Sequence, residues 1–170
     1  MKPGFTLLEL LVVLVIIGVV TVFVAPKMAG SLANMNLKTA SREISASLRY
    51  ARDRAVSSQK PWMARFDLDK GELVIGPKKD ESEKMEEEPE RPERKKDAGE
   101  RYELPGSVRI EKVVLGEEEM DSGSFELRFL TSGGSSGGRI VLINEREWRC
   151  AIEADFVTGL VKVHDLGKEH

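Results

Sequence analysis

The feature that most constrains this chain is an apolar stretch near its start, residues 5–25. It consists of apolar residues, glycine and threonine around a single ionisable residue, Glu9. As a helix, about 21 residues extend roughly 30 Å, which is the thickness of the hydrocarbon core of a bilayer. The sequence therefore predicts a membrane-spanning helix. A lone carboxylate there costs something like 2 to 4 kcal/mol, so we expect Glu9 to have a cationic partner.

A short charged leader, residues 1–4, precedes the apolar stretch. Ordinary secretory signals place a small-residue cleavage site after their apolar part. Here the small-residue candidate, Gly4, comes before it. Cleavage after Gly4 would leave the apolar helix on the mature chain and make Phe5 its new amino terminus.

The run Gly4-Phe5-Thr6-Leu7-Leu8-Glu9 resembles the class III signal of type IV pilins and type II secretion pseudopilins. The resemblance implies that a prepilin peptidase cleaves between Gly4 and Phe5 and that Phe5 is N-methylated. The alternative is an ordinary signal anchor in which the Gly-Phe pair and the glutamate occur by chance.

Cleavage also creates a cation that suits Glu9, the amine of Phe5. Glu9 serves its own terminus poorly, because its side chain lies along the helix surface whereas the amine is at the end of the axis. A neighbouring subunit shifted by about one turn would bring its amine alongside. The resemblance implies that this pair, Glu9 and Phe5, registers each subunit in a helical filament.

Two residues predict an irregular segment further along the helix. Proline removes a hydrogen-bond donor and clashes with the preceding turn, and glycine weakens a helix. Gly18 and Pro26 therefore predict a kink or a locally unwound segment, which the resemblance places inside an assembled filament. Alternatively, Pro26 only marks the membrane exit.

After the membrane stretch (residues 5–26), an amphipathic pattern predicts that the helix continues through residues 27–57. Small and apolar residues recur every three or four positions. They are Ala33, Leu37, Ala40, Ile44, Leu48, Ala51 and Ala55. The arginines on the other faces are interpreted as solvated rather than as a nucleic-acid-binding stripe.

The rest of the chain, residues 61–170, predicts a β-rich head. Strands are expected at residues 62–67, 72–75, 108–115, 124–130, 139–143, 148–153 and 160–163, with Thr158-Gly159 closing the last hairpin. Residues 77–101 are almost entirely charged or proline, which predicts a flexible, solvated insertion rather than a docking arm. The predicted fold class is α+β: a long N-terminal helix packed on antiparallel sheets.

The C-terminal half carries a second resemblance. Phe129-Leu130-Thr131-Ser132, the glycine-rich run 133–138, the two strands that follow and Thr158-Gly159 resemble the pattern of pseudopilin H and FimT-like minor pilins. The charged insertion departs from that pattern. This resemblance implies a pilin-like fold and places the chain nearest the H group.

Nothing in the sequence predicts an enzyme, a metal site or a cofactor. The glycine-rich run lacks the Lys-Ser or Lys-Thr of a phosphate loop. His164 and Asp165 are adjacent on a strand and face opposite sides, so they cannot align for catalysis. Cys150 is the only cysteine, which excludes an internal disulfide. Acidic residues 117–119 and Asp121 lack the spacing of a calcium loop, and a solvated loop is expected there.

The resemblance implies a minor pseudopilin of a type II secretion system. It would be anchored once in the inner membrane with a periplasmic C-terminal domain. Its implied partners are other pseudopilins, the prepilin peptidase, the inner-membrane assembly platform and, before assembly, membrane lipid. The net charge of −3 and a pI near 5.6 argue against nucleic acid as a partner. The alternative is a FimT-like minor type IV pilin acting in pilus assembly or DNA uptake.

Overall fold

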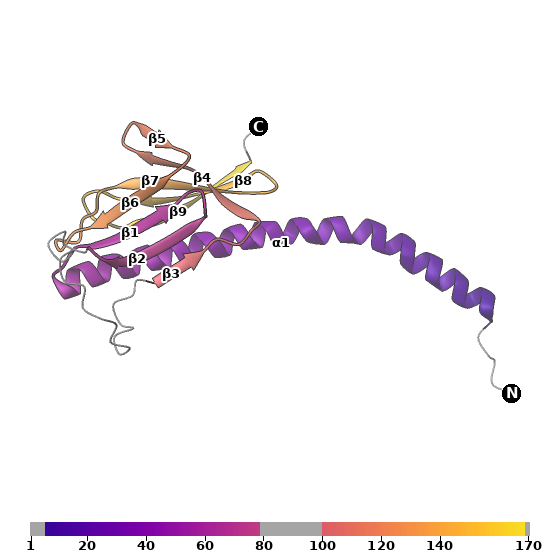
Figure 1. The fold of residues 1–170 in the computed structure, drawn as a ribbon. Coiled ribbons are helices and arrows are strands. Elements are labelled where there is room, and N and C mark those ends of the chain that lie inside the picture. Colours follow the sequence, from indigo (N-terminus) through magenta and orange to yellow (C-terminus); the bar gives the residue numbers. More distant parts are fainter. Residues whose placement is uncertain (1–5, 79–99, 169–170) are drawn as a thin grey trace.

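The computed structural model describes residues 6–78 and 100–168, with only the backbone described at residues 22–31. This part of the chain forms one helix and nine strands (Figure 1). In order they are α1 (Leu7–Ser58), β1 (Trp62–Asp67), β2 (Glu72–Pro77), β3 (Glu100–Glu103), β4 (Val108–Leu115), β5 (Glu118–Met120), β6 (Ser124–Phe129), β7 (Gly138–Asn144), β8 (Trp148–Ala154) and β9 (Val161–Lys168). The predicted α+β class is confirmed.

The helix α1 is 52 residues long. It begins after Thr6, whose side chain caps the first turn, and ends at Ser58, followed by the capping residue Gln59 in a left-handed conformation with φ of 53°. Figure 1 shows its second half lying along the head and its first half extending away from it. The second half buries all seven of the small and apolar residues predicted from the pattern. Their alanines let the helix approach the strands closely.

The strands form two antiparallel sheets. One has the order β3-β2-β1-β6 and the other has the order β5-β4-β7-β8-β9. Side chains alternate between core and solvent along β6, and Phe125 of that strand stacks on Phe66 of β1 with ring centroids 6.0 Å apart. The helix contacts strands of both sheets, and buried residues of the helix and of the two sheets form a single core. Burial of this core is the main force that holds the helix to the head.

Two short strands, β3 and β5, were not expected from the sequence. β3 is largely exposed and lies at the edge of its sheet, where it pairs with β2. β5 consists of Met120 and two glutamates that the sequence assigned to a solvated loop, and Glu119 of β5 pairs with Lys112 of the adjacent β4 at 3.0 Å. Because these strands are stabilised by pairing rather than by burial, an alternation of apolar residues does not reveal them.

The ends of the predicted charged insertion belong to strands. β2 extends to Pro77 and β3 begins at Glu100. The intervening residues 79–99 lie outside the described part of the chain. At the C-terminus, β9 runs to Lys168, five residues beyond the predicted strand end at 163. Its burial pattern is mostly exposed, which is why alternation did not predict its length.

Candidate assembly site

The start of α1 places Glu9 in the first helical turn. The backbone N–H of Glu9 donates to Oγ1 of Thr6 at 3.2 Å, so Thr6 is the N-cap and Glu9 the third helical residue. A carboxylate at this position also interacts favourably with the positive end of the helix dipole. Glu9 is exposed, which leaves its carboxylate accessible to a partner. The two residues of the predicted cleavage site, Gly4 and Phe5, lie outside the described part of the chain.

The residues that follow Glu9 form a contiguous apolar surface. Every described side chain from Leu7 to Val20 is exposed, and Leu7 is 84% and Leu14 67% exposed. Soluble monomers rarely expose contiguous apolar patches of more than a few hundred Å². This half of the helix therefore requires an apolar environment outside the chain itself.

Judged on the residues that the structure describes, α1 is not long and apolar enough to cross a membrane. The helix is unbroken through Gly18 and Pro26 and curves gently along its first half (Figure 1). Within it, the hydroxyl of Thr21 donates to the carbonyl of Ile17 at 2.8 Å. A kink or unwound segment at Gly18 and Pro26 stays a prediction for the assembled state.

At the far end of α1, Arg52 ties the helix to two loops of the head. Its Nε donates to the carbonyls of Gly133 and Thr158, each at 3.0 Å. Gly133 belongs to the glycine-rich loop after β6, and Thr158 belongs to the β8–β9 hairpin. Ser135 is buried and donates its hydroxyl to the carbonyl of Asp155 at 2.9 Å, which joins the same two loops. Two segments that are distant in sequence are therefore fixed against one helix end.

The β8–β9 hairpin is ordered by one carboxylate. Oδ1 of Asp155 accepts hydrogen bonds from the backbone N–H and the hydroxyl of Thr158, both at 2.7 Å, and from the N–H of Val157 at 3.1 Å. These bonds, that from the Thr158 N–H most of all, lower the pKa of Asp155. The hairpin holds Phe156 and Val157 in the solvent, 68% and 78% exposed.

We expect the stability that Asp155 contributes to disappear on acidification. A carboxyl with a lowered pKa in the folded state stabilises the fold at pH values above its unfolded pKa, about 4. That contribution is lost as the pH falls through the lower folded pKa. Urea unfolding of Asp155→Asn should therefore depend less on pH below about 4 than wild type. Asp121→Asn, at an exposed site between β5 and β6, should keep the wild-type acid dependence; an equal change in both variants would contradict this assignment.

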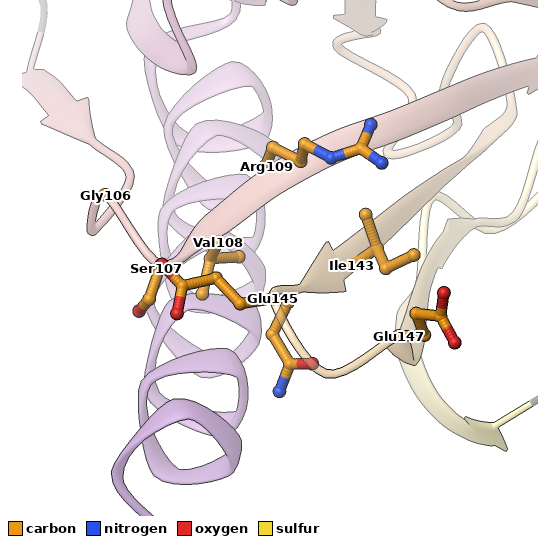
Figure 2. A pocket seen from close by; sticks show the side chains of 8 residues that line it. Gly106, Ser107, Val108, Arg109, Ile143, Glu145 and Glu147 are labelled. Carbon is orange, nitrogen blue, oxygen red and sulfur yellow. The ribbon is translucent and has the colours of Figure 1, made fainter. Parts of the chain in front are cut away.

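A shallow pocket of about 270 Å³ lies where the head meets the middle of α1. Figure 2 shows Ser107 and Glu145 close together at one end and Arg109, Ile143 and Glu147 at the other. These side chains do not converge on a common point. A groove between α1 and β3 holds Tyr102, whose pKa is raised by burial and by a hydrogen bond with Glu43.

The junction beside this pocket is stabilised by amide side chains. Asn144 is buried and donates from Nδ2 to Oδ1 of Asn34 at 2.8 Å, while its own Oδ1 accepts from the N–H groups of Arg146 and Trp148. Asn36 donates to the hydroxyl of Ser107 at 2.9 Å. These bonds fix the angle at which the helix leaves the head. Sequence patterns did not reveal them, because single asparagines in a helix carry no periodic signal.

The other candidate groups have structural roles. Cys150 is buried, and burial raises the pKa of its thiol. His164 and Asp165 occupy successive positions of β9, as predicted, and His164 lies 3.8 Å from Glu153 instead. Within residues 6–78 and 100–168, no group of three His, Cys, Asp or Glu side chains is arranged to hold a metal ion.

The chain is similar to known proteins both in its N-terminal motif and along most of its length. The model of the prokaryotic N-terminal methylation motif matches residues 2–25. Type II secretion system protein H of Xanthomonas campestris pv. campestris is 26% identical over 160 residues, which cover 94% of this chain and 81% of that protein.

Solved structures share the fold. The minor pseudopilin EpsH of the type 2 secretion system of Vibrio cholerae has a TM-score of 0.57 and 15% identity, covering 78% of this chain and 99% of that one. The type IV minor pilin FimU of Pseudomonas aeruginosa has a TM-score of 0.52 and 16% identity, covering 77% of this chain and 90% of that one. The predicted resemblance to type IV pilins and pseudopilins, nearest the H group, is confirmed.

Proposed function

We propose that this chain, which has the N-terminal methylation motif and the fold of type IV pilins and pseudopilins, is a minor pseudopilin of a type II secretion system. It would be a structural subunit of a short periplasmic filament that drives folded proteins across the outer membrane. The observation that carries the proposal is the division of α1: its second half is packed into the head, and its first half presents uncovered apolar side chains.

That division suits a subunit with two successive environments. Before assembly, the exposed stretch from Leu7 to Val20 would lie in lipid, and after assembly it would pack against the same stretch of neighbouring subunits. The head is held to α1 by a core that does not involve this stretch. The subunit can therefore move from lipid into a filament without refolding its head.

Processing would prepare the amino terminus for assembly. Cleavage between Gly4 and Phe5 and methylation of Phe5 would place a charged amine on the residue directly before the N-cap, Thr6. Both Thr6 and Glu9 remain after cleavage, so the first turn keeps its cap. We propose that Glu9 of one subunit pairs with the amine of Phe5 of the next. This pairing neutralises a carboxylate that would be costly in an apolar surrounding.

The proposed location and partners follow from this role. The chain would be a single-pass protein of the inner membrane with its head in the periplasm, where the prepilin peptidase and the assembly platform act on it. Other pseudopilins would be its partners in the filament. Its contribution would be structural rather than catalytic.

A second candidate is a FimT-like minor pilin acting in pilus assembly or DNA uptake. The fold similarity to the minor pilin FimU supports it, with a TM-score close to that of EpsH. The similarity to protein H over 94% of this chain favours secretion.

Deletion of the gene and complementation with the full chain would test the proposal. We expect deletion to leave exported proteins folded in the periplasm and complementation to restore their release into the medium. Twitching motility and DNA uptake, measured in the same strains, should be unchanged. Normal secretion together with loss of motility or DNA uptake would contradict the proposal and establish the minor pilin instead.

A further inference from the structure

Among the described residues, the strand β9 forms one edge of the five-stranded sheet. In the described part of the chain, β9 pairs with β8 on one side and is last in the strand order. The N–H of Asp155 donates to the carbonyl of Leu160 at 3.0 Å, so Asp155 and Leu160 are a hydrogen-bonded pair. Along the hairpin, hydrogen-bonded pairs then alternate with pairs whose backbone groups point outward. Lys162 and His164 then bond towards β8, and the backbone groups of Val161, Val163 and Asp165 point away from it.

A hydrogen bond on that edge agrees with the assignment of Val161 as a residue whose backbone groups point away from β8. Nη2 of Arg49 donates to the carbonyl of Val161 at 3.1 Å. The edge is therefore reachable from α1, and the polar groups of Val163 and Asp165 continue it along the strand. An added strand would satisfy these groups in the way that a sheet neighbour does.

Basic residues of α1 follow the same edge. Lys38, Arg42 and Arg49 are separated by four and seven residues, so they lie in one row on the helix. Arg49 contacts β9 directly, and both Lys38 and Asp165 act electrostatically on the thiol of Cys150. Arg42 lies between them and is exposed. The row therefore runs beside β9.

The strand itself adds further positive charge. Lys162 and Lys168 are exposed on β9, whose one carboxylate is Asp165; Lys162 lies opposite Glu153 of β8, on the other face of the strand from the buried Val161. Val163 and Leu166, 40% and 48% exposed, provide apolar contacts between the charges. The chain as a whole carries a net charge of −3, so this basic edge departs from the overall balance.

The edge strand of the four-stranded sheet is more acidic. β3 carries Glu100 and Glu103 together with Arg101, and the groove beside it is also lined by Glu43 of α1. The two edges therefore differ in charge.

We propose that the edge of β9, together with Lys38, Arg42 and Arg49, is a docking site for an extended acidic segment of a partner protein, which adds to the sheet as a further strand. Backbone pairing would supply the alignment, and acidic side chains would meet the basic row. The site belongs to the head and exists whether or not the chain acts in secretion.

Two other occupants fit the edge less well. A nucleic acid would satisfy the positive charges but has no backbone groups that continue a β-ladder. A second copy of β9 would add Lys162 and Lys168 to a surface that already carries Lys38, Arg42 and Arg49, and lysines on edge strands are one way in which proteins keep such strands apart. An acidic strand satisfies both the backbone groups and the charges.

Binding of a short peptide of alternating Glu and Val to the full chain in detergent micelles tests the site. The peptide carries a fluorescent label, and its anisotropy reports binding. We expect saturable binding that weakens as salt is added, because the contacts are exposed ion pairs. On binding, hydrogen exchange should slow at the amides of Val163 and Asp165. A peptide of alternating Lys and Val should not bind.

Arg42→Glu should weaken peptide binding by about tenfold, since reversal of one charge replaces attraction with repulsion. Lys60→Glu makes the same change of charge at an exposed position beyond the end of α1 and should alter binding by less than about twofold. Val163→Pro removes an N–H that points to the free edge while leaving the bonds of Lys162 and His164 to β8, and it should also weaken binding. Circular dichroism checks that each variant is folded.

The proposal is overturned if the peptide does not bind or if Arg42→Glu and Lys60→Glu bind it equally. Two further results would identify another occupant and equally overturn it. One is displacement of the peptide by a single-stranded oligonucleotide that loses affinity in Arg42→Glu but not in Val163→Pro. The other is self-association of the full chain that is lost in Arg42→Glu.

Discussion

Glu9→Ala is expected to abolish incorporation of the subunit into filaments while leaving cleavage after Gly4 and membrane insertion intact. The variant removes the carboxylate that we propose to meet the amine of Phe5 in a neighbouring subunit. It also makes the first half of α1 more apolar, so insertion should not suffer. Immunoblots of sheared filaments measure incorporation, and the mass of the membrane-bound chain measures cleavage and methylation.

A second role of Glu9 has to be separated from assembly. The residue occupies the third helical position after the N-cap Thr6, where a carboxylate also stabilises the helix start. Glu9→Gln keeps a side chain that suits a capping box but loses the charge, whereas Thr6→Ala removes the cap and keeps the charge. We expect Glu9→Gln to fail in assembly and Thr6→Ala to assemble. The opposite pair of results would assign Glu9 to the helix cap and contradict the pairing.

Much of the fold is encoded in local patterns that the sequence shows directly. The helix end, predicted at residue 57, lies at Ser58, and β1 and β4 begin and end where the alternation predicts. These elements each bury one face in the core, so their apolar residues recur with the period of the element. β3, β5 and the second half of β9 are stabilised by backbone pairing at sheet edges, which imposes no such pattern.

The contacts that position the head were not predictable in the same way. The sequence predicts that Arg52 is one of several solvated arginines. In the structure it donates hydrogen bonds to the carbonyls of Gly133 and Thr158, which lie 81 and 106 residues further along the chain. The sequence predicts Thr158-Gly159 as the turn of the last hairpin and the glycine-rich loop as part of a resemblance, but neither pattern predicts that the two loops meet. In the structure the two loops meet at Arg52, and the backbones of Gly133 and Gly159 approach so closely there that Gly159 leaves no room for a side chain.

Gly159→Ala tests that meeting point and should strongly destabilise the head. Gly159 has φ of +62°, and a Cβ there would overlap the carbonyl oxygen of Gly133, which is a backbone atom and cannot move aside alone. The same Cβ would lie 3.1 Å from Nε of Arg52, the donor that joins both loops. Backbone strain and the displaced loop together should cost about 3 kcal/mol or more.

Gly116→Ala is the matched control. Gly116 and Gly159 have the same left-handed backbone conformation, but they differ in how much room a Cβ atom would have. Gly116 has φ of +61°, and no atom lies within 4 Å of the Cβ position. This variant should cost only the left-handed conformation, about 1 kcal/mol. Urea unfolding followed by the fluorescence of Trp62 and Trp148 measures both. Equal losses would show that the approach of Gly159 to Gly133 is not a tight contact, whereas a larger loss in Gly159→Ala would establish that the two loops and Arg52 form one packed unit at the end of α1.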